Sequence, residues 1–198
     1  QRNIIGQFGL ELPRSYYIEF AMVFSLSSDQ MLIKQSATRF LEDKCPKARV
    51  RELRESESGY DPEMWREMVE LGWMGLLIPE EYGGMDSGLL DLAVIMEEIG
   101  RSLLPSPFFP TVALCSLPLL THGTVRQKQS FLPGIASGEA IWSLALIEDS
   151  GELDPSGIKL QATIEGEDYI LEGRKLFVPY GHVANYFLVV SRTGDETR

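Results

Sequence analysis

The side chains that most often carry out chemistry are few in this sequence and far apart. There are two histidines, His122 and His182, and two cysteines, Cys45 and Cys115. Two isolated imidazoles without a cysteine cluster do not make a zinc site. Asp and Glu are abundant, but no pair stands out as an acid–base dyad, and no G-x-G-x-x-G, Walker, G-x-S-x-G or H-E-x-x-H motif occurs. The residues alone define no reaction and no metal site, and we interpret His182 as a plain turn histidine.

One short stretch could hold a ligand against the end of a strand. Residues 175–183 read KLFVPYGHV. The run Leu176–Val178 favours a strand, whereas Pro179 has no backbone N–H to give to a sheet. The simpler interpretation is an ordinary strand end. The alternative is that a ligand lies there and that Pro179 has removed a contact to it.

The bulk composition narrows the class of protein. A chain of 198 residues can form one large domain or two small ones, and 44% hydrophobic residues permit a sizeable core. The net charge of −11 argues against nucleic-acid binding, which needs a basic face. The longest apolar tract, residues 108–120, contains two prolines and is shorter than the roughly 20 residues of a membrane span. The cysteines form no disulfide framework, so we expect a cytoplasmic protein in a reducing environment.

Residues 1–21 are left unassigned. Glu11, Arg14 and Glu19 interrupt the apolar residues, so no secretory signal is expected. Met22 would be a natural start, and the preceding residues could be read-through, a cloning scar or a genuine extension.

Local signals predict helices over most of residues 22–137. Ser27 with Gln30, and Thr124 with Gln127, have the spacing of a capping box. Asp61 followed by a proline is typical of a helix start. Residues 89–104 place one apolar stripe on a helix, made of Leu92, Ala93, Met96, Ile99 and Leu103.

The spacing of the apolar residues changes after residue 137, from a helical to a strand-like pattern. Residues 140–148, 160–166, 169–178 and 183–193 read as strands, with a hairpin turn at 166–168. Helices followed by strands indicate an α+β fold. We predict an all-α domain over 22–137 and a truncated, incomplete antiparallel β domain over 138–198.

Several segments, in order, resemble the acyl-CoA dehydrogenase family. The most specific are LGWMGLLIPEEYGG at 71–84 and LPGIASGE at 132–139, supported by LAVIMEEIGRSL and GRKLFVPYGHVANYFLVVSRT. The resemblance runs from about Met22 to Arg198. It implies a helical domain, a middle β domain and a C-terminal helical bundle.

The resemblance also implies an activity. Family members hold FAD and remove two hydrogens from an acyl-CoA thioester in fatty acid metabolism, pass electrons to an acceptor, and form homo- or hetero-oligomers. The catalytic glutamate belongs to the C-terminal bundle, so we predict no catalytic residue here and no activity from residues 1–198 alone.

Two flavin-contacting segments of the family can be carried over. A Thr-Glu-Pro-x-Ala-Gly-Ser-Asp segment aligns with residues 147–154, and a Trp-Ile-Thr turn with 177–179. By this resemblance the cofactor-binding positions are Leu144, Leu146, Ile147, Glu148, Leu153, Phe177, Val178 and Pro179, with Leu153 also near substrate. Contacts of 144–148 would be made by the main chain. Phe177 would keep an aromatic wall, or else be an ordinary core residue.

Three hydroxyls of the family pattern are missing, because Ile147, Leu153 and Pro179 replace them. At about 0.5–1.5 kcal/mol for each lost hydrogen bond, flavin binding would weaken by on the order of 2–4 kcal/mol. This loss favours an alternative, a flavin-poor, non-catalytic subunit that packs against a complete partner. A third possibility is a broken reading frame with no stable fold.

Overall fold

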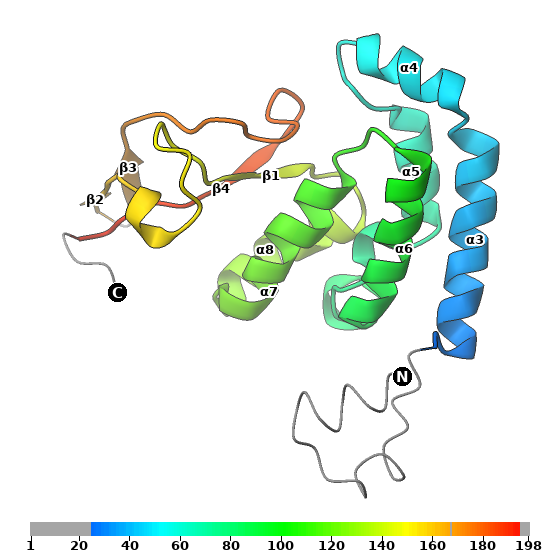
Figure 1. Ribbon diagram of the computed structural model, residues 1–198. Helices are drawn as coiled ribbons and strands as arrows, with labels where there is room; N and C mark the ends of the chain where they lie inside the picture. Colours follow the sequence, from blue (N-terminus) through cyan, green and yellow to red (C-terminus); the bar gives the residue numbers. More distant parts are fainter. Residues whose placement is uncertain (1–24, 167, 195–198) are drawn as a thin grey trace, which may run out of the picture. The chain divides into compact units, whose positions relative to one another are not determined.

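A computed structural model describes residues 25–166 and 168–194 (Figure 1). The predicted extension over residues 1–21 lies outside the described residues. The chain divides into two compact units, Gln1–Leu32 and Ile33–Arg198. Of the first unit only residues 25–32 are described, and they contain the first turn of helix α3.

The described part of the chain is helical up to residue 136 and contains strands only after it, as predicted. The helices are α3 (Ser28–Lys44), α4 (Lys47–Glu55), α5 (Pro62–Glu70), α6 (Leu89–Ser102), the π-helix η3 (Phe109–Ser116), α7 (Leu117–His122) and α8 (Val125–Ala136). Short 3-10 turns are η1 (Trp73–Gly75), η2 (Glu80–Tyr82) and η4 (Pro155–Gly157). The strands are β1 (Trp142–Ala145), β2 (Ala162–Glu165), β3 (Asp168–Leu171) and β4 (Tyr186–Val189). An α+β class is thereby confirmed.

The predicted helix starts are confirmed by their caps. Ser27 and Gln30 exchange both bonds of a capping box at 3.1 Å, and Thr124 and Gln127 do the same at 3.2 and 2.9 Å. The Asp61 carboxylate accepts from the first free N–H groups of α5. Each cap satisfies amides that have no partner inside the helix.

The apolar stripe predicted for α6 is partly wrong. Leu92 and Ile99 are buried, but Ala93 and Leu103 are exposed. Ile95 is buried in place of Ala93, because residues at i, i+3 and i+7 share the face that meets the core. Leu103 lies beyond the helix end.

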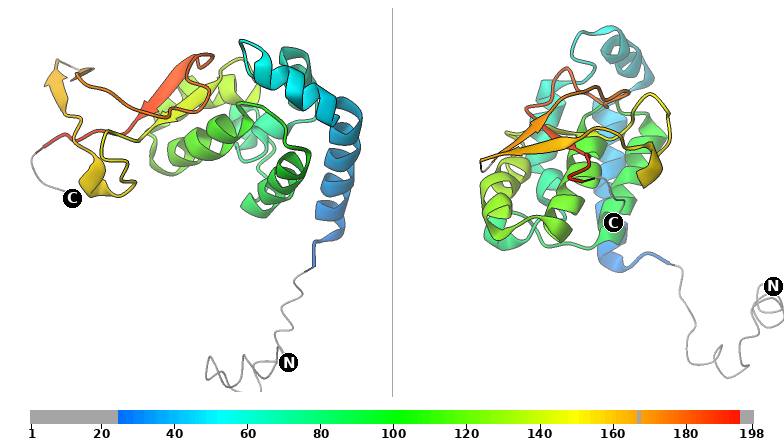
Figure 2. Two further views of the ribbon diagram at one scale, coloured as in Figure 1. Left: turned by 45° about the horizontal axis from the view of Figure 1, so that its top comes forward. Right: turned by 90° about the vertical axis from the view of Figure 1, so that its left-hand side faces the viewer.

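Two clusters of buried side chains form the core. The larger gathers residues of α3, α5, α6 and η1 around Trp73, whose ring meets Phe40 and Phe108 edge-on at 5.3 and 6.2 Å. The second joins α8, η3 and β1 through residues such as Leu132, Cys115 and Trp142. The β2–β3 hairpin lies to one side of α5–α8 in Figure 1 and in the left view of Figure 2.

β1 is tied directly to the helices. Thr111 of η3 donates its hydroxyl to the Trp142 carbonyl and accepts from the Trp142 amide, both at 3.1 Å. The Trp65 indole of α5 donates to the Gly138 carbonyl at 2.9 Å. The β segments therefore start from a fixed position on the helical layer.

The sheet differs from the predicted antiparallel arrangement. β2 and β3 pair antiparallel, as the hairpin signal predicted, although turn residue 167 lies outside the described residues. β1 and β4 instead pair parallel, with Trp142 opposite Tyr186. The prediction of an incomplete antiparallel β domain is wrong for this pair, because the long connection between Ala145 and Tyr186 brings β4 back in the same direction.

The strand predicted over 169–178 also ends early, at Leu171. Phe177 and Tyr180 have φ values of +50° and +53°, which no extended strand contains. The peptide at Leu176 is held by the carbonyl of Ile147 rather than by a continuous ladder. The residues around Pro179 therefore form an irregular loop with two left-handed residues, not the end of a strand.

Candidate functional site

The two segments that the family resemblance singled out lie side by side. The Leu176 amide donates to the Ile147 carbonyl at 2.8 Å, and Lys175 Nζ donates to the Leu146 carbonyl at 3.1 Å. Residues 146–148 follow β1, whose position is fixed by η3. Residues 175–177 are thereby held against the end of β1, and we call this arrangement the β1-end surface, made of 146–148 and 175–179.

A nearly buried ion pair holds the two segments together. Lys175 Nζ lies 2.7 Å from Glu148 Oε1, with side chains 7% and 11% exposed. The Glu148 carboxylate also accepts from the Lys159 and Leu160 amides at 2.9 and 3.0 Å. Burial by itself raises the pKa of Glu148, but the bonds from Lys175, Leu160 and Lys159 outweigh it and lower that pKa below its usual value.

Sequence reasoning missed Lys175. It assigned Glu148 a main-chain contact only, whereas the side chain organises the loop. A signal for this pair was present in the sequence, since the lysine and the glutamate each adjoin an apolar run. Charged side chains buried beside such runs need a partner of opposite charge. Their pairing across 27 positions could not be read from local pattern.

The Phe177 ring is presented to solvent. It is 83% exposed, so the interpretation of Phe177 as an ordinary core residue is wrong. Its φ of +50° is costly for a residue with a side chain. Backbone strain that no buried contact offsets is typical of positions that bind a ligand.

Backbone amides beside Phe177 have no partner within the described residues. The β1–β4 ladder closes with the Val190 amide on the Ala145 carbonyl at 3.1 Å. Among residues 25–166 and 168–194, the amides of Leu146, Ile147 and Glu148 donate no hydrogen bond. All three residues are partly buried, and buried N–H groups are ordinarily paired. The β1-end surface thus offers free donors next to an exposed aromatic ring.

The other predicted positions are spread more widely. Pro179 is exposed and its carbonyl accepts from the buried Ser143 hydroxyl, which anchors the loop to β1. Val178 is half-buried, and its carbonyl accepts from Gly181. Leu144 pairs with Leu188 and packs on the second core cluster. Leu153 is 66% exposed, on a loop that no described contact joins to Phe177.

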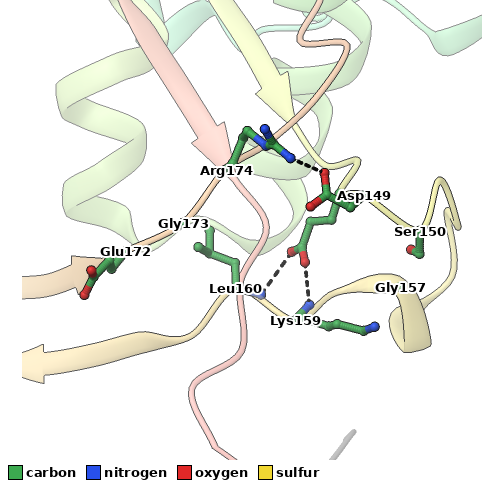
Figure 3. Close-up of a pocket in the computed structure, with 9 residues that line it drawn as sticks. Asp149, Ser150, Gly157, Lys159, Leu160, Glu172, Gly173 and Arg174 are labelled. Carbon is green, nitrogen blue, oxygen red and sulfur yellow. Dashed lines mark hydrogen bonds and ion pairs between the residues drawn. The ribbon is translucent and has the colours of Figure 1, made fainter.

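A hollow of about 340 Å³ lies beside this surface (Figure 3). Its wall includes Glu148, the main chain at Gly157 and Gly173, and the exposed pair in which Arg174 donates to Asp149 at 2.7 Å. The wall carries three carboxylates, of Glu148, Asp149 and Glu172, against two basic groups, Lys159 and Arg174. The hollow therefore has no strong preference for an anion.

The remaining reactive residue types have structural surroundings. His182 Nε2 lies 3.1 Å from the Ser58 carbonyl, which suits a turn histidine. Cys45 and Cys115 are free and buried, and burial raises the pKa of the Cys115 thiol to about 12. Within the described ranges, no group of His, Cys, Asp and Glu is arranged to hold a metal ion. No helix in this part of the chain is both long and apolar enough to cross a membrane.

The helical layer followed by a partial β domain defines an α+β fold, and sequence comparison assigns the family. The family model for the acyl-CoA dehydrogenase N-terminal domain matches residues 27–139. The chain therefore belongs to the acyl-CoA dehydrogenase family.

Comparison with individual proteins supports the same family. The chain is 33% identical to mitochondrial isovaleryl-CoA dehydrogenase of Pongo abelii, over 85% of this chain and 40% of the relative. Its structure is similar to that of an acyl-CoA dehydrogenase complexed with FAD from Bacillus anthracis, at TM-score 0.75 and 28% identity, covering 85% of this chain and 29% of that one. It is also similar to the ChsE4-ChsE5 complex of Mycobacterium tuberculosis, at TM-score 0.77 and 28% identity, covering 86% and 45%. The chain spans less than half the length of these proteins.

Proposed function

We propose that this chain is part of an FAD-dependent acyl-CoA dehydrogenase and that the β1-end surface receives the isoalloxazine ring. The observation that carries the proposal is the exposed, strained Phe177 ring beside the free amides of Leu146–Glu148. A flat heteroaromatic ring with polar edges complements both features, because it can stack on a ring and accept from N–H groups. The likeness to a structure complexed with FAD supports the same assignment.

The residues present fit the flavin in part. Phe177 would stack on it, and the amides of Leu146, Ile147 and Glu148 would donate to its polar edge. When bound, FAD would accept the hydride removed from the acyl group. Ile147, Leu153 and Pro179 supply no side-chain hydroxyl, so we expect weaker binding than the family pattern with three hydroxyls provides.

The protein's own contribution is positioning. The Lys175–Glu148 pair sets the spacing between 146–148 and 175–177, and Ser143 fixes the loop through the Pro179 carbonyl. We propose an acyl-CoA thioester as substrate, with Leu153 near it, and an electron-transfer acceptor as redox partner. No residue of the described ranges is proposed as catalytic.

A second candidate is a flavin-poor subunit of a hetero-oligomeric acyl-CoA dehydrogenase. The three missing hydroxyls favour it, because a subunit that holds no flavin needs none of them. The likeness to the ChsE4-ChsE5 complex shows that this fold occurs in an assembly of two named chains. We further propose that the protein forms homo- or hetero-oligomers and that the domain boundary lies at 137/138. We also propose a cytoplasmic location, which the two free cysteines suit.

Flavin titration separates the two candidates. Quenching of FAD fluorescence by the purified protein should give saturable binding, and Phe177→Ala should weaken it at least fivefold. Phe109→Ala, which removes another exposed phenylalanine (46% exposed), is the matched control and should leave binding unchanged. A protein that binds no flavin alone but copurifies with a flavin-containing partner would support the subunit and overturn flavin binding by this chain.

A further inference from the structure

A second hollow lies where the end of α6, helix α4 and the loop after Pro179 meet. Its volume is about 400 Å³, within the range of about 300–1,000 Å³ typical of small-molecule sites. Its lining is mainly apolar and aromatic and contains no acidic residue. The lining residues are Val50, Arg54, Gly59, Leu103, Pro105, Tyr180 and His182.

Leu103 occupies a backbone position that favours glycine. It follows the last turn of α6 with φ +58°, and the Leu103 and Leu104 amides bond back to Gly100 and Ile99 at 3.2 Å each. This is the left-handed helix end at which glycine has no steric cost. Leu103 is nevertheless 68% exposed, so its side chain makes too few buried contacts to offset the backbone strain. Leucine at 103 brings no evident advantage to the fold itself.

Tyr180 repeats this pattern on the facing wall. Its φ is +53°, and its hydroxyl donates to the Gly59 carbonyl at 3.2 Å, where Gly59 itself has φ +67°. The ring stacks on His182 with centroids 6.2 Å apart. Two of the four non-glycine residues with positive φ among the described residues therefore line one hollow. Clustered backbone strain of this kind is typical of ligand clamps.

Arg54 is the one permanently charged residue among those that line the hollow. Arg54 donates through Nε and a terminal nitrogen to Glu55 at 3.0 and 2.7 Å, but both side chains are more than 70% exposed. Exposed pairs of this kind contribute little and exchange partners readily. The guanidinium is therefore available to a carboxylate held between Leu103 and Tyr180.

We propose that this hollow binds a small apolar carboxylate, with its hydrocarbon part between Val50, Leu103, Pro105 and the Tyr180 ring and its carboxylate at Arg54. Such a ligand covers the exposed leucine, and its contacts offset the backbone strain at Leu103 and Tyr180. The site uses none of the residues of the β1-end surface, so it stands independently of flavin binding.

Octanoate is the probe, titrated into the full chain while NMR signals of the Leu103 methyl groups and the Tyr180 ring are followed. For a ligand of about ten heavy atoms we expect a dissociation constant on the order of 1 mM. Arg54→Gln should weaken octanoate binding at least threefold. Octanol, which lacks the charge, should bind more weakly than octanoate and be insensitive to Arg54→Gln.

Leu103→Gly separates a ligand-binding role from a structural one. Glycine suits the left-handed backbone, so the melting temperature should stay equal or rise while octanoate binding falls at least fivefold. Leu90→Ala, at an exposed leucine (71%) in the first turn of α6, is the control and should leave binding unchanged. A lower melting temperature for Leu103→Gly would show that the leucine serves the fold and would overturn the proposal. Absence of shifts at these signals up to ~20 mM octanoate, or equal affinity for octanol, would also overturn it.

Discussion

The Lys175 ammonium and the Glu148 carboxylate lie 2.7 Å apart with side chains only 7% and 11% exposed. The pair joins the segment after β1 to the segment that carries Phe177. The neighbouring Arg174–Asp149 pair, one residue before Lys175 and one after Glu148, is also 2.7 Å long but is 70% and 74% exposed. The two pairs differ mainly in burial, and burial decides how much each contributes.

Lys175→Met should destabilise the protein strongly, because it leaves the Glu148 carboxylate buried without its cation. Breaking a buried pair from one side costs about 3–5 kcal/mol. Arg174→Gln, which breaks the exposed pair, is the control and should barely change the urea midpoint. Equal shifts of the two midpoints would mean that the Lys175–Glu148 pair is solvated.

The stability of the protein should fall in acid partly through Glu148. Its pKa is lower in the folded than in the unfolded state, so the folded state gains stability above the unfolded value of about 4.3. That gain is lost as the pH falls through the lower, folded pKa. Asp61 and Glu98 share this direction. Urea midpoints measured from pH 7 to pH 3 should therefore fall less steeply for Glu148→Gln than for the wild type, and parallel curves would contradict the assignment.

Phe177→Gly should stabilise the protein while weakening flavin binding. Glycine adopts φ +50° without the strain of a side chain, and the exposed ring contributes little burial, so a gain of about 0.5–1 kcal/mol is expected. Phe108→Ala is the contrasting variant, since Phe108 is 1% exposed and its loss should cost about 3–5 kcal/mol. Urea unfolding and FAD titration of the same samples measure both effects. A destabilised Phe177→Gly protein would show that the ring supports the fold.

Glu98→Gln should destabilise the contact between α3 and α6. The Glu98 carboxylate is buried, 2.7 Å from Arg101 Nε and 2.9 Å from the Thr38 hydroxyl. An amide removes the charge, and with its oxygen facing Arg101 and Thr38 it turns its NH2 group toward the Lys34 ammonium, which lies 3.7 Å from Oε1 in the wild type, at a cost of about 1–3 kcal/mol. Glu97→Gln is the control, because Glu97 pairs with Lys34 at the surface. Thermal melts of the two variants should differ clearly, and matching melts would contradict this role for Glu98.

The local signals of the sequence predicted much of the helical layer. Ser27 with Gln30, Asp61, and Thr124 with Gln127 were all placed correctly, since a cap depends on residues within one turn. The stripe on α6 was partly wrong, because periodicity defines an apolar face only to within a neighbouring residue and packing selects Ile95 over Ala93. The family was also predictable, since the motifs at 71–84 and 132–139 are contiguous in sequence.

Amino-acid order alone determined where helices begin, that strands follow residue 137 and which family the chain belongs to. Tertiary structure decided that β4 runs parallel to β1, that Phe177 faces outward, that Lys175 neutralises Glu148, and that Leu103 and Tyr180 share a hollow. These features join positions far apart in the chain. They depend on long-range packing and on the cost of burying charge, which residues within one helical turn do not encode.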